Sequence, residues 1–160
     1  MSWKKINSNL QDVLETDDIY NYKIMDCGSE EDLCFYNCVC KALESHDKFN
    51  SLFPIFLQQM VEDEISSSAF YQAFKEESEI GVGHLEMLIS SKILNCIFTI
   101  YVETENGIQI EKIWDKENVN TPEFSIELYL EEFSSHFYLL GKKKQSQRRG
   151  RFETYFSFLI

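Results

Sequence analysis

The sequence predicts an α+β domain in which helices pack on a small central β-sheet. Helix-compatible segments dominate the first half of the chain, and strand-compatible segments dominate the second half. An Asn-Gly pair in the second half is a strong hairpin signal. The 160 residues can bury one hydrophobic core but not two, and an apolar content of 44% argues against disorder.

Hydrophobic periodicity places the elements of the first half. We expect an amphipathic helix over 2–16, a short strand over 19–25, a turn at 28–31 and a helix over 35–43. Residues 48–79 read as helical, because Pro54 suits a first helical turn and the run Ser66-Ser67-Ser68 marks a break. We expect the aromatic residues of this region to lie in the core: Phe53, Phe56, Phe70 and Phe74.

In the second half, a glycine turn at 79–83 opens a helix that ends near Asn95. Four strands are then predicted, over 97–102, 108–114, 124–130 and from His136 into 137–140. We expect residues 1–141 to form the domain and 142–151 to form a basic linker or arm. Residues 152–160 are too apolar for a solvated tail and form a last strand or continue into further sequence.

The charge pattern favours a basic protein partner. The net charge is −12, although residues 142–151 hold six basic and no acidic residues. A strongly acidic body is poorly suited to general nucleic-acid binding, which depends on neutralising phosphates. An alternative hypothesis keeps residues 142–151 as an arm for nucleic acid or a membrane surface; a solvated linker is the simpler interpretation.

Composition also limits the compartment and the chemistry. No apolar run reaches the roughly 18–20 residues that cross a bilayer, and the N-terminus lacks the apolar core of a secretory signal. Five cysteines without a Cys-x-x-Cys pair fit neither a zinc site nor a disulfide framework. We therefore expect reduced thiols in the cytoplasm, with four of them as small buried side chains: Cys27, Cys38, Cys40 and Cys96.

Cys34 is the candidate nucleophile. It stands where an acidic, loop-like run ends and an apolar, helix-compatible segment begins. The dipole and free N–H groups of a helix N-terminus favour a thiolate and bind a developing oxyanion. The amides of the preceding loop, Glu31-Asp32-Leu33, are the candidate oxyanion hole.

His136 is the candidate base. An imidazole within hydrogen-bond reach removes the thiol proton and later protonates the leaving amine. The distance in sequence is no obstacle, because cysteine and histidine partners meet in space. Taken singly, Cys34 and His136 also fit ordinary core positions, and we expect His46 and His84 to be plain surface residues.

Three blocks of sequence strengthen the pairing of Cys34 with His136. Glu31-Asp32-Leu33-Cys34-Phe35-Tyr36 is similar to Asp-Gly-x-Cys followed by two apolar or aromatic residues that open a helix. The second block, Gly81-Val82-Gly83-His84-Leu85-Glu86, is similar to Trp-Gly-Gly-x-x-Glu. The third block, His136-Phe137-Tyr138-Leu139-Leu140, is similar to a histidine and an aromatic residue that enter a strand. With these blocks in order over residues 26–140, the chain resembles the ovarian-tumour (OTU) family of cysteine deubiquitinases.

The resemblance implies a papain-type fold and thiol-dependent hydrolysis of isopeptide bonds of ubiquitin or a ubiquitin-like modifier. It implies Cys34 as nucleophile and His136 as base. We expect ubiquitin or a ubiquitin-like protein as partner, no cofactor or metal ion, no membrane or nucleic-acid partner, and a monomer. If the source is a virus or an intracellular parasite, the expected compartment is the cytoplasm of its host. The residue usage and the compact size of the chain would suit such a source.

The chain also departs from the family's pattern. Asp32 stands in place of the glycine, Glu31 in place of the aspartate, and Gly81 and Val82 in place of the tryptophan and first glycine. Tyr138 occupies the position where many members carry the Asp or Asn that orients the imidazole.

Some members take the orienting acid from a position upstream of the cysteine. By that analogy Asp26 is the first candidate for the third catalytic residue and Asp32 the second. If neither carboxylate reaches His136, the alternative is a catalytically weak or inactive ubiquitin-binding module on the same fold.

Overall fold

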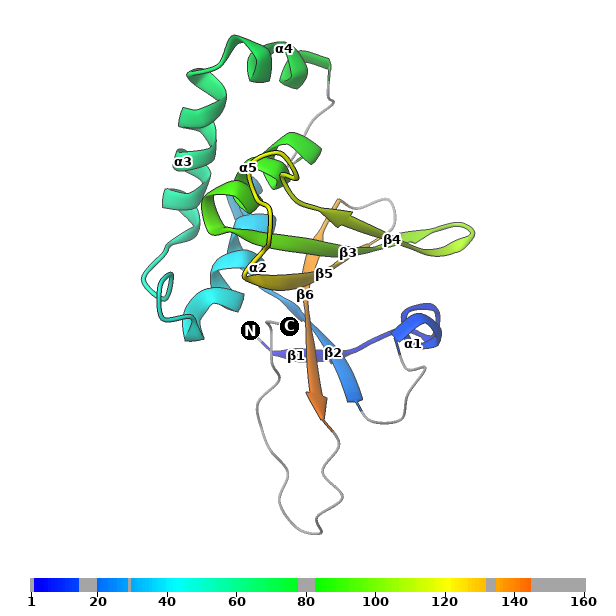
Figure 1. The fold of residues 1–160 in the computed structure, drawn as a ribbon. Coiled ribbons are helices and arrows are strands. Elements are labelled where there is room, and N and C mark those ends of the chain that lie inside the picture. The colour runs from blue at the N-terminus through cyan, green and yellow to red at the C-terminus, as the bar shows by residue number, and fades with distance from the viewer. Residues whose placement is uncertain (1, 15–19, 29, 78–82, 132–134, 145–160) are drawn as a thin grey trace.

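The computed structural model describes residues 2–14, 20–28, 30–77, 83–131 and 135–144 (Figure 1). Within the described residues of the first half, the strands and helices are β1 (Trp3–Lys5), α1 (Ser8–Leu14), β2 (Tyr20–Asp26), α2 (Cys34–Ala42), α3 (Pro54–Ser66) and α4 (Ala69–Glu77). Short 3₁₀ turns at Glu30–Asp32 and Leu43–Ser45 flank α2. The second half contains α5 (His84–Leu94), β3 (Cys96–Thr104), β4 (Gly107–Ile113), β5 (Phe124–Leu130) and β6 (Phe137–Lys144).

The described strands form one six-stranded sheet in the order β1-β2-β6-β5-β3-β4. All neighbours are antiparallel except β3 and β5, which run parallel. The early strand β2 lies beside β6, the last of the described strands, with Asp26 opposite Tyr138. This pairing brings the segment before Cys34 next to the segment that follows His136.

The two faces of the sheet carry separate apolar clusters. Helices α2 and α5 cover one face, with α3 packed against both of them, and α1 lies on the other face, where Leu10 and Leu14 pack with Ile24 and Leu140 (Figure 1). The ring of Phe35 packs edge-on against Phe98 and Phe137, with centroids 5.3 and 5.5 Å away. Because Phe35 follows Cys34 directly, this contact fixes the start of α2 against β3 and β6.

Most predicted elements are confirmed. The strands over 97–102, 108–114 and 124–130, the helices at α2 and α5, and the break at Ser66–Ser68 all appear within about two residues of their predicted bounds. The strand predicted over 137–140 is also present and runs on to Lys144. Pro54 begins α3 as expected. The Asn-Gly pair turns β3 into β4, with Gly107 at φ +105°.

The helix predicted over 2–16 is wrong in its first part. Trp3, Lys4 and Lys5 form the edge strand β1, opposite Met25, Ile24 and Lys23. The helix starts only at Ser8, because the Asn7 side chain accepts the Leu10 N–H at 2.8 Å and caps it. The apolar residues that suggested one helix therefore belong to two elements, the strand β1 and the helix α1.

The expected burial is also wrong for three of the four aromatic residues named in 48–79. Phe53 and Phe56 are each 59% exposed and Phe70 is 72% exposed; the side chain of Phe74 lies outside the described residues. Helix α3 buries only one narrow stripe, formed by Leu57, Val61 and Ile65. Residues on the adjoining face therefore remain in solvent.

Strand β6 continues three residues into the basic run. Lys142, Lys143 and Lys144 lie opposite Tyr22, Asn21 and Tyr20 of β2. The remainder of 142–151 and the segment 152–160 lie outside the described residues, so the predicted division of the chain stays a prediction. Among the described helices, none is long and apolar enough to cross a bilayer.

Candidate active site

Cys34 is the first residue of α2, and the Leu33 carbonyl accepts the helical hydrogen bond from Asn37 N–H at 2.7 Å. All five cysteines are free thiols, and Cys34 alone is half-buried while the other four are buried. Its Sγ lies 3.9 Å from the carbonyl oxygen of Ser135. The candidate nucleophile therefore reaches the surface beside the residue that precedes His136.

The loop before Cys34 has a left-handed turn. Asp32 adopts φ 57°, a conformation that costs most L-residues energy and that glycine adopts freely. The backbone at Asp32 thus takes a shape available to the glycine that the OTU pattern has there. Leu33 N–H donates to the Glu30 carbonyl at 3.1 Å, so this amide must leave that partner to bind an oxyanion. The oxyanion role of 31–33 stays a prediction.

His136 enters β6 from another left-handed residue, Ser135, at φ 53°. Its side chain is 16% exposed, and its Nε2 lies 3.0 Å from Asp26 Oδ1. Asp26 is the last residue of β2 and lies opposite Tyr138 in β6. The strand register therefore places the first of the two candidate carboxylates at hydrogen-bond distance from the imidazole.

Asp26 is held in its ionised form. The Gly28 N–H donates to its Oδ1 at 2.9 Å, and this hydrogen bond is the main cause of a lowered pKa for the Asp26 carboxyl. Burial acts in the opposite direction, while His136 and the charge of Lys4 lower the pKa further. Asp32, the second candidate, is exposed in the turn before α2.

The contacts give the two imidazole nitrogens different tasks. An ionised carboxylate can only accept a hydrogen bond, so Nε2 of His136 carries the proton that it shares with Asp26. The neutral ring then has Nδ1 as its basic nitrogen. The structure thus pairs the Asp26 carboxylate with the His136 imidazole and places the Cys34 thiol beside Ser135, the residue before that histidine.

Helix α2 runs alongside the start of β6. Cys38, one turn after Cys34, has its Sγ 3.5 Å from the Phe137 carbonyl oxygen. Thiols on one face of α2 therefore contact the carbonyls on either side of His136. This packing holds the N-terminus of α2 next to the histidine.

The remaining cysteines behave as the sequence predicts. Cys27, Cys38, Cys40 and Cys96 are buried and unpaired by disulfides. Burial raises the pKa of Cys40 to about 12 and also raises that of Cys96; for Cys38 the contact with Cys27 is the larger cause, with burial second. Neutral buried thiols of this kind are poor nucleophiles.

The second sequence block has a structural role in the part that the structure describes. The Glu86 carboxylate accepts the Gly83 N–H at 2.9 Å and so closes the first turn of α5. His84 is exposed at the start of α5, as expected, whereas His46 is half-buried and stacks on Phe49. Gly81 and Val82 lie outside the described residues.

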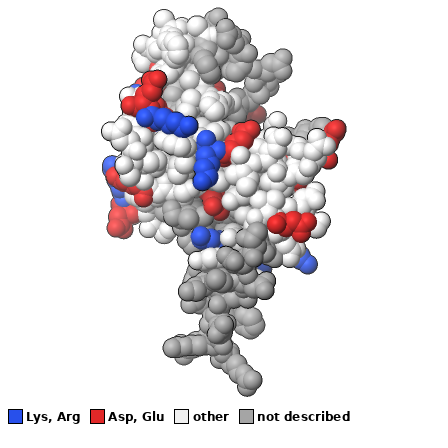
Figure 2. Space-filling model, turned by 45° about the vertical axis from the view of Figure 1, so that its right-hand side comes forward, with Lys and Arg blue, Asp and Glu red and all other residues white. Residues whose placement is uncertain are grey.

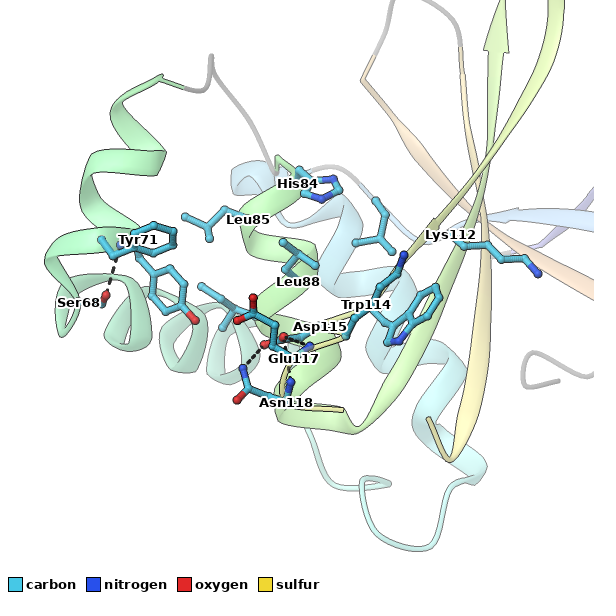
Figure 3. Close-up of a pocket in the computed structure, with 14 residues that line it drawn as sticks. Ser68, Tyr71, His84, Leu85, Leu88, Lys112, Trp114, Asp115, Glu117 and Asn118 are labelled. Atoms are coloured by element: carbon cyan, nitrogen blue, oxygen red, sulfur yellow. Dashed lines mark hydrogen bonds between the residues drawn. The ribbon is translucent and has the colours of Figure 1, made fainter. Parts of the chain in front are cut away.

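A separate cavity of about 640 Å³ lies between α4, α5 and residues 112–118 (Figure 3). Tyr71 faces Leu85 and Leu88 from α4, and Trp114 lies on the other side (Figure 3). The Asp115 carboxylate stabilises the turn that follows it, because it accepts hydrogen bonds from Glu117 and Asn118. Cys34, His136 and Asp26 are not among the residues that line this cavity. In the described part of the chain, no group of three or more His, Cys, Asp or Glu side chains is placed to hold a metal ion.

Comparison with solved structures bears on the fold. An OTU domain solved in complex with ubiquitin aligns with 78% of this chain and 72% of its own, at 15% identity and a TM-score of 0.56. The fold is that of an OTU domain. A viral OTU protease from Qalyub virus aligns with 87% of this chain and 97% of its own, at 15% identity and a TM-score of 0.45. No protein-family profile and no curated protein matches the sequence.

An identity of 15% supports the fold and leaves catalysis to be argued from this chain's own contacts.

Proposed function

We propose that this chain is a cysteine peptidase that hydrolyses isopeptide bonds of ubiquitin or a ubiquitin-like modifier. The observation that carries the proposal is the 3.0 Å contact between Asp26 Oδ1 and His136 Nε2, on an OTU fold that sets Cys34 beside the residue before that histidine. Asp26 and His136 lie 110 positions apart in the sequence, so the contact depends on the whole sheet.

The proposed reaction follows from these positions. His136 Nδ1 takes the Cys34 proton, and the thiolate attacks the isopeptide carbonyl carbon to form a tetrahedral oxyanion. As the C–N bond breaks, the imidazolium returns its proton to the leaving lysine amine, which leaves a thioester on Cys34. Water then attacks the thioester with His136 again as base, releasing the modifier's carboxylate and restoring the thiol. Asp26 keeps the proton of the ring on Nε2 throughout.

Two surface features support a protein partner. The chain carries a net charge of −12, and Figure 2 shows acidic side chains on several parts of the visible face. Phe53, directly before α3, and Phe56 and Met60 within α3 are exposed to solvent, and exposed apolar side chains rimmed by polar ones are typical of interaction sites. A partner with a basic, partly apolar face complements both features. The ubiquitin bound to the similar OTU domain makes ubiquitin the first modifier to test.

A second candidate function is a ubiquitin-binding module without turnover. The observation in its favour is the loop before Cys34, where Asp32 replaces the expected glycine and Leu33 N–H is already bonded to Glu30. This module would bind ubiquitin through the same faces but form no thioester.

A ubiquitin whose C-terminus carries an electrophile separates the two functions. The enzyme forms a covalent adduct on Cys34 with the native chain; Cys34→Ala forms none, and His136→Ala slows adduct formation strongly. Ubiquitin chains of several linkages then measure isopeptide cleavage. No adduct with any ubiquitin-like probe, or an adduct that persists in Cys34→Ala, excludes the enzyme. Binding without an adduct supports the module.

A further inference from the structure

Glu131 bonds to the segment around His136 at two points. Its backbone N–H donates to the His136 carbonyl at 3.2 Å, and its carboxylate accepts the Tyr138 hydroxyl at 2.7 Å. These bonds extend the β5–β6 register, in which Leu130 lies opposite Phe137. Glu131 therefore ties the backbone of His136 and the side chain of Tyr138 to the end of β5.

The ring of Tyr138 contacts the imidazole directly. The centroids of Tyr138 and His136 are 4.7 Å apart and the rings are nearly perpendicular, at 79°. Tyr129 of β5 lies opposite Tyr138 in the sheet, and the two ring centroids are 5.9 Å apart. Because Asp26 lies opposite Tyr138 across β2 and β6, the imidazole has the carboxylate as one neighbour and the phenol ring as another.

The hydroxyl of Tyr138 stays protonated at neutral pH. Burial, followed by the neighbouring Glu131 carboxylate, raises the pKa of Tyr138 to about 12. A protonated phenol donates to an ionised carboxylate, which is a strong, short type of hydrogen bond. The Tyr138–Glu131 hydrogen bond therefore anchors the phenol ring beside the histidine.

We propose that Glu131 and Tyr138 form a clamp that positions His136 against Asp26, with Tyr138 acting at the place where many OTU members carry the orienting acid. Both are positioning residues: Asp26 supplies the charge, and the clamp limits rotation of the imidazole. Only its consequence for turnover rests on the proposed function.

The clamp is tested first by a signal that does not depend on catalysis. An imidazole N–H that is hydrogen-bonded and shielded from water gives a downfield proton resonance in NMR spectra, whereas a loose one exchanges too fast to be seen. The native chain shows this resonance for Nε2–H of His136, identified by its loss in His136→Gln. Tyr138→Leu removes the ring and the hydroxyl, and Tyr138→Phe removes the hydroxyl alone.

The clamp predicts a graded result. Tyr138→Phe and Glu131→Gln keep the resonance with faster exchange, because each retains part of the clamp, while Tyr138→Leu and Glu131→Ala lose it. The control is Tyr20→Leu, which removes a half-exposed tyrosine from the far end of β2. Thermal unfolding of every variant checks that it is folded.

Three results overturn the clamp: a native-like resonance in folded Tyr138→Leu, an equal loss in Tyr20→Leu, or no resonance in the native chain. Should Tyr138→Leu fail to fold, Glu131→Ala against Glu131→Gln decides the question by the same signal.

Turnover gives the second readout. If the chain hydrolyses ubiquitin conjugates, Tyr138→Leu lowers kcat by about tenfold or more with little change in KM, because a misplaced base slows chemistry and leaves docking intact. Tyr138→Phe recovers most of that loss. An unchanged kcat in Tyr138→Leu counts against the clamp. If the native chain has no turnover, the proposed function fails while the NMR signal still decides the clamp.

Discussion

The Asp26 carboxylate accepts hydrogen bonds from the Gly28 N–H and from His136, at 2.9 and 3.0 Å. The backbone amide is the largest cause of the lowered pKa of the Asp26 carboxyl, and His136 lowers that pKa further. A carboxylate that a backbone N–H helps to keep ionised suits the proposed role of orienting the imidazole. Sequence reasoning could name Asp26 only by analogy with a family.

The lowered pKa of Asp26 predicts a pH dependence of stability. Between the native pKa and the ordinary value near 3.8, the native state binds fewer protons than the unfolded state. The contribution of Asp26 to the free energy of unfolding is therefore complete at pH values above its ordinary pKa, and it is lost as the pH falls through its lower, native-state pKa. We expect the difference in free energy of unfolding between the native chain and Asp26→Asn to shrink on acidification below about pH 5.

Urea unfolding at a series of pH values measures this difference. Glu105→Gln, at the exposed β3–β4 turn, controls for the loss of one surface charge. A difference between native and Asp26→Asn that is the same at neutral and acid pH would contradict the assignment of a lowered pKa.

Asp32 poses a separate question of backbone strain. At φ 57° an L-residue pays roughly 1–2 kcal/mol, and a β-branched side chain is the least compatible. We expect Asp32→Val to be less stable than Asp32→Gly by about 1–2 kcal/mol in urea unfolding, because glycine adopts this φ freely. Both substitutions remove the same carboxylate, so each controls for the other. Equal stabilities would show that the turn relaxes to another conformation.

At the scale of elements, the site is assembled where three segments meet. The end of β2 provides Asp26, the start of α2 provides Cys34, and the turn into β6 provides His136. Local patterns predicted α2 and β6 because apolar periodicity is a short-range property. The same patterns misassigned the start of the helix predicted over 2–16, since an edge strand and a capped helix together mimicked one longer helix.

Helix α3 shows how a pattern of apolar residues can mislead. Leu57, Val61 and Ile65 are buried, while Phe53, Phe56 and Met60 are exposed on the adjoining face. Spacing alone cannot separate a wide core-facing stripe from a narrow one beside an interaction surface. The number of elements that pack on the helix decides between them.

The exposed face of α3 yields a prediction about binding. We expect Phe56→Ser and Met60→Ser to change the free energy of unfolding by less than about 0.5 kcal/mol, because both side chains are largely solvated. If α3 contacts ubiquitin, each raises the Kd of the Cys34→Ala chain for ubiquitin by about fivefold or more. Titration calorimetry measures the Kd, and Gln59→Ser on the same helix is the matched control. Unchanged affinity in Phe56→Ser and Met60→Ser removes α3 from the docking surface.

At the scale of the whole molecule, the strand order β1-β2-β6-β5-β3-β4 interleaves early and late segments of the chain. The order joins the antiparallel pair β1–β2 to β6, the last described strand, and leaves the β3–β4 hairpin at the far edge. The parallel pairing of β3 with β5 separates that hairpin from β6. An overall negative charge surrounds this framework and favours encounters with a basic partner.

The sequence alone determined the class of the fold, most elements, the burial of four cysteines and the choice of Cys34 and His136 as a pair to test. These features depend on periodicity, turn chemistry and motifs that lie within a few residues of each other. Only the tertiary structure decided which carboxylate meets His136, that Tyr138 and Glu131 flank it, and which aromatic residues of α3 face solvent. Each of these depends on strand register or on packing between elements far apart in the chain, such as the 110 positions between Asp26 and His136.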